Sequence, residues 1–206
     1  MAKVTNKTAK SSHAGRPKAF DPKQALDAAL SVFWERGYEG TSITDLTKAM
    51  KLNKPSLYAT FGDKAELFRK VVDRYLATQT SVWEEIFREA TARTAIARLF
   101  NDSADSLTSG QRPRGCLLVQ SALTCSAESE CIKKELALKR ADGDSMLRAR
   151  LARAQAEGEL APDVDVAALS RYFSTILRGI SVEASAGATR QDLQNVIDVA
   201  MKSWPT

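Results

Sequence analysis

Apolar residues recur every three or four positions along almost the whole chain, which is the spacing of one face of an α-helix. Few stretches are rich in strand-forming residues, so we predict an all-α fold. Glycine, proline and capping residues divide the pattern into about nine helices. We expect one from Pro22 to Arg36, two short ones between Ser42 and Phe61, a long one from Lys64 toward Phe87, and five near 92–108, 115–125, 127–157, 165–186 and 189–203.

The stretch from Ser42 to Lys64 holds two short helical patterns joined by a very short turn. Ser42 and Asp45 have the spacing of a capping box, in which each side chain bonds a free backbone N–H of the other. Asn53 is a good N-cap for the second pattern, and Pro55 falls in the first turn, where a missing N–H costs nothing. Two helices joined in this way form a helix-turn-helix.

The second of these helices has an unusual outward face. Leu57 and Phe61 stack on one side as core residues, and the opposite side carries small groups flanked by a cation and a phenol. A duplex major groove admits such a surface, because small groups reach base edges while the borders hold phosphates. The outward residues are Pro55, Ser56, Ala59 and Thr60, with Lys54 and Tyr58 at the borders. The alternative is a pair of short core helices with a solvated polar face.

The positive charge of the chain is concentrated at its N-terminal end. The full chain has a net charge of +5, with 30 basic and 25 acidic residues. Residues 1–62 hold ten basic groups against five acidic ones, so residues 63–206 are neutral overall. The excess therefore accompanies the helix-turn-helix, where attraction to phosphates would need it.

Composition excludes several other classes of protein. With 206 residues, 44% apolar and 27% charged, the chain matches ordinary globular proteins, and no apolar run is long enough to cross a bilayer. There is no apolar core of a signal peptide, so we expect a cytoplasmic protein. The only histidine, His13, lies in the N-terminal tail, which removes histidine-based nucleophilic triads and Cys/His zinc sites from the folded part. We expect no metal, no cofactor and no enzymatic activity.

Three regions follow from these patterns: a flexible basic arm over 1–19, a helix-turn-helix domain over 20–64, and a larger helical domain over 65–206, to which the family resemblance described next assigns effector binding and dimerisation. The arm ends in Gly15-Arg16-Pro17-Lys18, a proline-stiffened basic segment suited to an adjacent minor groove. In that interpretation Arg16 and Lys18 contact DNA. A solvated tail that adds only general affinity fits these residues equally well.

Three segments together resemble the N-terminal domain of TetR-family transcriptional repressors. They read G-R-P-K-A-F-D-P, A-L-x-x-F-W-E-R-G-Y-E-G-T-S-I-T-D-L and L-N-K-P-S-L-Y-A-T-F-G-D-K-A-E-L-F. The resemblance covers a quarter to a third of the chain. It implies a three-helix DNA-binding domain followed by a helical domain that binds a small effector and dimerises through its last two helices.

We expect base contacts from Pro55, Ser56 and Ala59, with Thr60 beside them. We expect backbone contacts from Thr41, Ser42, Lys54, Tyr58 and Lys64. Apolar residues recur at helical spacing on the last two helices and predict a two-fold interface made by Leu169, Tyr172, Ile176, Ile180, Leu193, Val196, Ile197 and Met201.

The effector site is less sharply indicated. Its candidate lining residues are Trp83, Phe87, Phe100, Cys116, Tyr172 and Phe173. Each of the aromatic residues taken alone fits core packing as well as a pocket. Cys116 follows Arg114-Gly115 at a predicted helix start, so it is either a reactive thiol or a buried apolar residue.

The sequence thus favours a ligand-responsive homodimer that binds a palindromic double-stranded operator and represses transcription until a small-molecule effector releases it. The alternative is a helical adaptor or structural protein whose basic domain binds nucleic acid without sequence preference.

Overall fold

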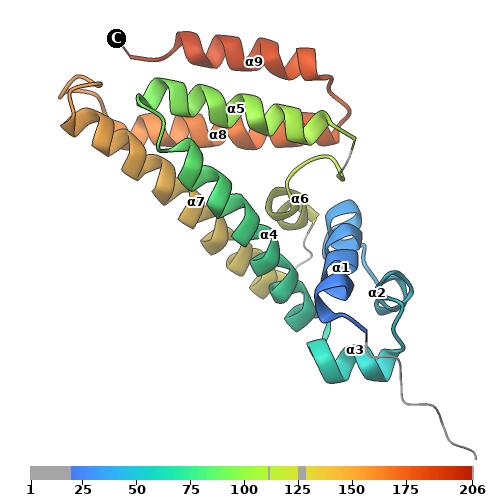
Figure 1. Ribbon diagram of the computed structural model, residues 1–206. Helices are drawn as coiled ribbons and strands as arrows, with labels where there is room; N and C mark the ends of the chain where they lie inside the picture. The colour runs from blue at the N-terminus through green and yellow to red at the C-terminus, as the bar shows by residue number, and fades with distance from the viewer. Residues whose placement is uncertain (1–19, 111, 125–128, 206) are drawn as a thin grey trace, which may run out of the picture.

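The computed structural model describes residues 20–110, 112–124 and 129–205, and within them it contains nine α-helices and no strand. The predicted all-α fold is confirmed. Arg16 and Lys18 lie outside the described residues. The helices are α1 (Pro22–Arg36), α2 (Ile43–Met50), α3 (Lys54–Phe61), α4 (Lys64–Ile86), α5 (Ala92–Thr108), α6 (Leu117–Thr124), α7 (Glu130–Ala156), α8 (Val166–Ser185) and α9 (Arg190–Lys202) (Figure 1).

Side-chain caps explain why the helices begin where they do. Capping boxes form at Ser42, as predicted, and also at Asp63 and Thr189, each with an acidic partner three residues on. Asn53 caps α3 by accepting from the backbone N–H of Ser56 at 2.8 Å. Each cap satisfies backbone donors that the first turn of a helix leaves free. The expected start of α7 at 127 lies outside the described residues, and the described helix runs from Glu130.

Two hydrophobic cores meet along α4. The first holds α1, α2, α3 and the first half of α4, and it continues through Leu117 and Leu118 of α6 and Ile132 and Leu136 of α7. The second lies among the end of α4 and helices α5, α7, α8 and α9. The expected boundary beside Lys64 therefore does not fall between the cores, because α4 contributes apolar residues to both.

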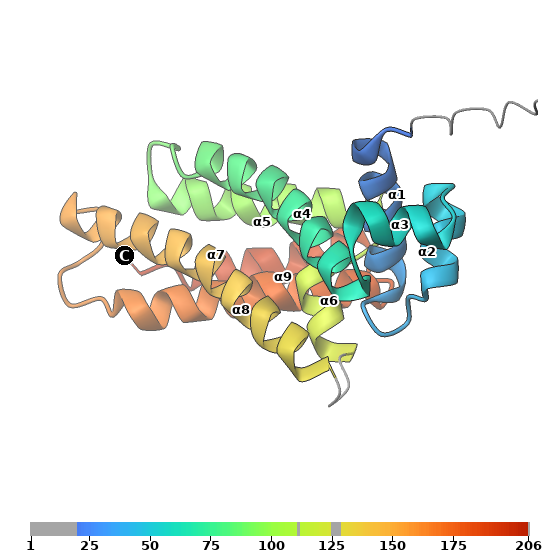
Figure 2. The same cartoon turned by 90° about the horizontal axis from the view of Figure 1, so that it is seen from below.

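Helices α4 and α7 run diagonally from the α1–α3 end toward the α8 and α9 end, and both views show them beside each other (Figures 1 and 2). Two ion pairs link them, Arg69 with Glu135 at 2.8 Å and Lys139 with Asp73 at 2.9 Å. Both pairs are substantially exposed, so each adds little to stability. They connect α4 to α7 beside the first core.

Candidate nucleic-acid interface and effector cavity

The turn between α2 and α3 is short and tightly held. Lys51 ends α2 in the left-handed conformation, with a φ of 55°, and its N–H bonds back to the carbonyl of Lys48. The N–H of Leu52 donates to the carbonyl of Thr47 at 3.0 Å. These bonds satisfy the end of α2 and turn the chain at once into α3.

Helix α3 has one buried side and one exposed side. Leu57 and Phe61 are buried in the first core, so the helix cannot rotate without losing that packing. Ser56 is half-buried, and Tyr58 is 48% exposed. The other predicted residues of this helix, Lys54, Pro55, Ala59 and Thr60, are all exposed. The outward face that the sequence predicted is thus present on a rigid element.

The hydroxyls of Thr41 and Ser42 are used inside the domain. Thr41 is 1% exposed and donates to the carbonyl of Gly37 at 2.7 Å. Ser42 accepts from the backbone N–H of Asp45 and donates to its carboxylate. The hydrogen bonds from Ser42, and then the charge of Arg36, hold the pKa of Asp45 below its usual value. Thr41 is therefore removed from the expected contact surface, because burial keeps its side chain from any partner molecule. Ser42 is exposed, but its hydroxyl serves the cap.

Three further basic residues lie close to α3 in the sequence: Lys48 in α2, Lys51 at its C-terminal cap and Lys64 at the start of α4. Together they are called the basic rim. Lys64 is half-buried, and its Nζ lies 4.4 Å from the centre of the Tyr38 ring, an attractive cation–π geometry. Lys48 and Lys51 are exposed and form no ion pair within the described part of the chain. Neither residue was assigned a role from the sequence. Both lie close in sequence to Lys54, across a short turn, and this closeness could have marked them as candidate phosphate contacts.

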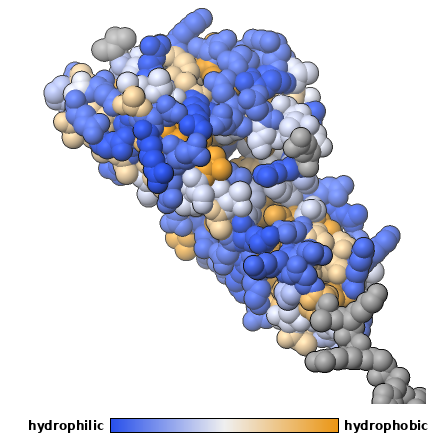
Figure 3. Space-filling model, viewed as in Figure 1, coloured by the Kyte–Doolittle hydropathy of each residue, from blue (hydrophilic) through white to orange (hydrophobic). Residues whose placement is uncertain are grey.

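A cavity of about 640 Å³ lies between α4, α5, α6, α7 and α8. Figure 3 shows the surface hollowed between the α5 region and the α1 region, with hydrophobic residues beside the hollow. Its walls are mainly apolar, and a few polar groups converge on it, as in small-molecule sites generally. The apolar lining residues include Leu76, Trp83, Ile86, Leu99, Leu107, Leu118, Met146 and Leu177.

The structure divides the predicted effector residues into two groups. Trp83 and Cys116 line the cavity, whereas the other four do not. Phe100 and Phe173 are fully buried against each other in the second core, with ring centres 5.9 Å apart. Phe87 is 8% exposed in that core, and Tyr172 packs on Phe173. These four aromatic residues fill the bundle rather than face the hollow, which corrects the expectation for them.

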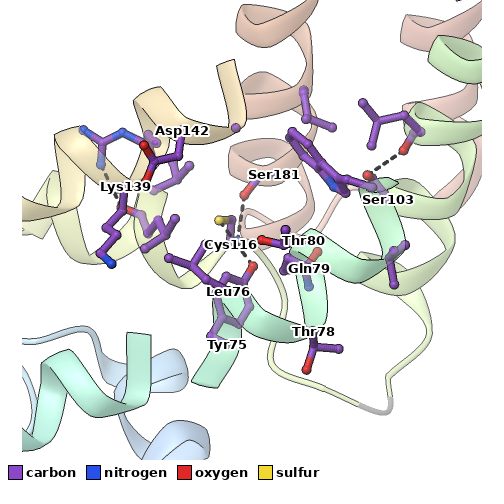
Figure 4. Close-up of a pocket in the computed structure, with 18 of the residues that line it drawn as sticks. Tyr75, Leu76, Thr78, Gln79, Thr80, Ser103, Cys116, Lys139, Asp142 and Ser181 are labelled. Carbon is purple, nitrogen blue, oxygen red and sulfur yellow. Dashed lines mark hydrogen bonds between the residues drawn. The ribbon is translucent and has the colours of Figure 1, made fainter. Parts of the chain in front are cut away.

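Cys116 is held at the cavity wall by neighbours from two helices. The hydroxyl of Tyr75 donates to its Sγ at 3.4 Å, and the backbone N–H of Cys116 donates to the hydroxyl of Ser181 at 2.7 Å (Figure 4). Burial, and then the neighbouring thiol, raise the pKa of Tyr75. The phenol therefore stays neutral and keeps its proton for this hydrogen bond.

Trp34 joins the first domain to this wall. Its indole N–H donates to the carbonyl of Gly115 at 2.7 Å, and its ring packs edge-on against Tyr75, with ring centres 4.9 Å apart. Gly115 has a φ of 85°, a backbone conformation that residues other than glycine rarely adopt. Trp34 also lines the cavity. A residue of α1 thus lines this cavity directly, a contact that the sequence analysis did not predict.

Comparison with known proteins adds two family matches. The chain matches the model of bacterial regulatory proteins of the tetR family over residues 25–71, and that of the tetracyclin repressor-like C-terminal domain over residues 92–200. The chain belongs to the TetR family. The predicted resemblance is therefore confirmed, and it extends from the helix-turn-helix to the helices that enclose the cavity.

Individual relatives cover nearly the whole of this TetR-family chain. The HTH-type transcriptional repressor ComR of Escherichia coli is 36% identical over 93% of this chain and 92% of its own. The HTH-type transcriptional regulator YezE of Bacillus subtilis is 30% identical over 91% and 97%. A solved cysteine mutant of the TetR family regulator CifR, complexed with 26 bp of operator DNA, is 40% identical, with a TM-score of 0.89, over 93% and 100%.

Part of the apolar surface of the last two helices of this TetR-family protein is buried in the core of the same chain. Three residues predicted for the interface, Ile180, Leu193 and Ile197, are each 1% exposed within the single chain, because α8 and α9 pack their apolar sides on α5. They cannot contact a second copy, and the expectation is corrected for them. Val196 is 41% exposed. Four others, Leu169, Tyr172, Ile176 and Met201, are partly buried against the second core.

None of the described helices is both long and apolar enough to cross a membrane. Within the same ranges of the chain, no three His, Cys, Asp or Glu residues gather closely enough to hold a metal ion.

The buried position of Thr41 generates a test. Thr41→Val keeps the shape of the side chain but leaves the Gly37 carbonyl without its partner, so we expect the free energy of unfolding to fall by about 1–2 kcal/mol. The measurement is urea denaturation followed by circular dichroism. Thr44→Val is the matched control, because Thr44 is exposed on α2, and we expect a change within about 0.5 kcal/mol. Equal stability of the two variants would show that Thr41 is not held as described.

Proposed function

We propose that this chain is a ligand-responsive, sequence-specific DNA-binding regulator of transcription, acting as a repressor that a small effector releases from its operator. The observation that carries the proposal is the exposed face of α3, held by a capped helix-turn-helix in a chain that matches repressors over nearly its full length. The operator-bound solved relative supports the same function. Because its partner is DNA, we propose that it works in the cytoplasm, without catalysing a reaction.

In this proposal α3 enters the major groove. Pro55, Ser56, Ala59 and Thr60 face base edges, where small apolar groups meet thymine methyls and hydroxyls meet hydrogen-bonding atoms. Lys54 and Tyr58 hold phosphates at the borders of the helix. Further phosphate contacts come from Lys48, Lys51 and Lys64, while Arg16 and Lys18 of the basic arm reach the minor groove. Neither Thr41 nor the hydroxyl of Ser42 takes part.

The cavity is the proposed effector site. Its size and mainly apolar wall suit a small ligand with a large apolar part. Its contact with Trp34 gives a route to the DNA-binding domain, because a ligand that displaces Tyr75 or Gly115 also displaces α1. A second trigger, chemistry at the Cys116 thiol, is favoured by the position of that residue on the same wall. Either event changes the spacing of two DNA-binding domains in a dimer, which tolerates little error.

The proposed dimer uses the outer side of α8 and α9. Exposed apolar residues remain there after the core is formed: Val182 is 37%, Val196 41% and Val199 63% exposed. Gly179 on α8 has open space where a side chain would begin, so another backbone can approach closely. Four helices from two copies would cover these residues in a two-fold arrangement.

The function is tested by selecting duplexes from a random pool and measuring affinity against salt. We expect a shared palindrome, because the proposed dimer reads two equal half-sites. Lys54→Ala should weaken binding to all sequences alike and lower the slope of log affinity against log salt by about one phosphate contact per subunit. Lys202→Ala, at the far end of α9, is the control and should change neither. Selection that yields no common sequence would favour the nonspecific nucleic-acid binder instead.

The dimer is tested by sedimentation at micromolar concentration. We expect twice the chain mass of 22.5 kDa for the native protein and a monomer for Val199→Glu, since a buried unpaired carboxylate is strongly unfavourable. Leu138→Glu is the matched control, because Leu138 is 70% exposed on α7, away from the proposed interface, and should remain dimeric. A monomeric native protein would overturn this part of the proposal.

The coupling of the cavity to DNA binding is tested by alkylation with N-ethylmaleimide. An adduct on Cys116 fills part of the cavity, so we expect the native protein to lose operator affinity and Cys116→Ser to keep it. The comparison is needed because Cys131 is exposed and also reacts. Equal loss in both proteins, or loss in neither, would exclude Cys116 as the trigger.

A further inference from the structure

A second cleft, of about 620 Å³, lies between α7 and α8 and adjoins the apolar cavity. The two share Arg140, Asp144, Ser174 and Arg178, which therefore form the partition between them. The charged residues that line the cleft are Arg140, Arg148, Arg171 and Arg178 against the single acid Asp144. The partition thus carries two arginines against one acid, beside a cavity whose wall is mainly apolar.

The one acid does not neutralise these cations. Asp144 accepts from Arg178 through both carboxylate oxygens; its charge also acts on Arg140, but the two residues form no ion pair. Arg140 is half-buried, and its Nη1 donates to the carbonyl of Leu118 at 3.1 Å, but it has no carboxylate partner within the described ranges of the chain. Burial, and then repulsion from Arg178, lower the pKa of Arg140. A cation held in this way is strongly attracted to an added anion.

The acids elsewhere on the cavity wall do not reverse this balance. Asp73 is paired with Lys139, and Asp102 with Arg98. Asp142 is an exposed residue, and its charge acts on Lys139 rather than on Arg140. Of the basic residues that line the cavity, Arg140 at the partition is half-buried and has no ion pair within the described part of the chain.

We propose that the effector is an amphipathic anion whose acidic head group pairs with Arg140 at the partition and whose apolar body occupies the cavity. This rests on the proposed effector role of the cavity. Arg140 is suited to the task because a guanidinium binds a carboxylate through two parallel hydrogen bonds. The apolar body would lie among Trp83, Ile86 and Met146, which line the same cavity.

The test uses decanoate below its micelle-forming concentration, with decanol as the uncharged probe of equal length. Binding is followed by tryptophan fluorescence, since Trp34 and Trp83 line the cavity. We expect decanoate to bind the native protein more tightly than decanol. Arg140→Gln should lose about ten- to a hundredfold in decanoate affinity while its decanol affinity stays unchanged, because only a charge-assisted pair is removed.

Arg93→Gln is the matched control, because Arg93 is exposed on α5 and lines neither cavity, and it should bind both probes as the native protein does. Equal affinity of the native protein for the two probes, unchanged decanoate binding by Arg140→Gln, or no decanoate binding at all would overturn the proposal. Operator affinity without a probe is measured in parallel. If the native protein without a probe does not bind an operator at all, the proposed regulatory function is refuted instead.

Discussion

The hydrogen bond from the Trp34 indole to the Gly115 carbonyl is the contact on which the joining of the two ends of the molecule depends. It is buried, and it connects residues 81 positions apart in the sequence. Its neighbours extend it in both directions: Trp34 packs on Tyr75, Tyr75 bonds Cys116, and Cys116 bonds Ser181 of α8. Removing one partner would leave a buried polar group unsatisfied, so the members hold one another in place.

This arrangement unites the helix-turn-helix and the cavity through side chains of modest size. Helix α1 packs against α2 and α4 in the first core, and its Trp34 reaches the cavity wall at the same time. A change of a few tenths of an ångström at Gly115 must be absorbed by α1 or by the wall, since closely packed interiors shift between discrete arrangements rather than deform smoothly. Under the proposed function, a ligand in the cavity would therefore act on the position of α3 through α1.

The helices and the outward face of α3 were predictable from sequence because interactions between neighbouring residues determine them. Asp21, Ser42, Asn53, Asp63 and Thr189 are capping residues whose partners lie within three positions, and Leu57 and Phe61 set the inward side of α3 by spacing alone. Two lysines of the basic rim, Lys48 and Lys51, stood on the polar side of the predicted α2 for the same reason.

Longer-range assignments were not predictable in this way. A hydroxyl at the start of a helix suits both a cap and a phosphate, so Thr41 could not be placed without the Gly37 carbonyl. Helical spacing marks an apolar side but not what covers it, which is why Phe100 and Phe173 proved to be core, and Ile180 and Ile197 are covered by their own chain. The contact between Trp34 and Gly115 leaves no trace in a single sequence.

The sharing of α4 between two cores has a practical consequence for building chimeric regulators. A DNA-reading module cut out after Lys64 would lose Leu67, Phe68, Val71 and Val72, which are almost fully buried in the first core. Extending the fragment to the end of α4 restores these residues but still leaves out Leu117, Leu118, Ile132 and Leu136. Grafting the proposed recognition residues of α3 onto an intact relative avoids this problem, because that surface is mostly exposed and does not belong to the second core. If α3 reads the operator as proposed, its surface residues can be transferred to another protein, whereas the domain that carries them cannot.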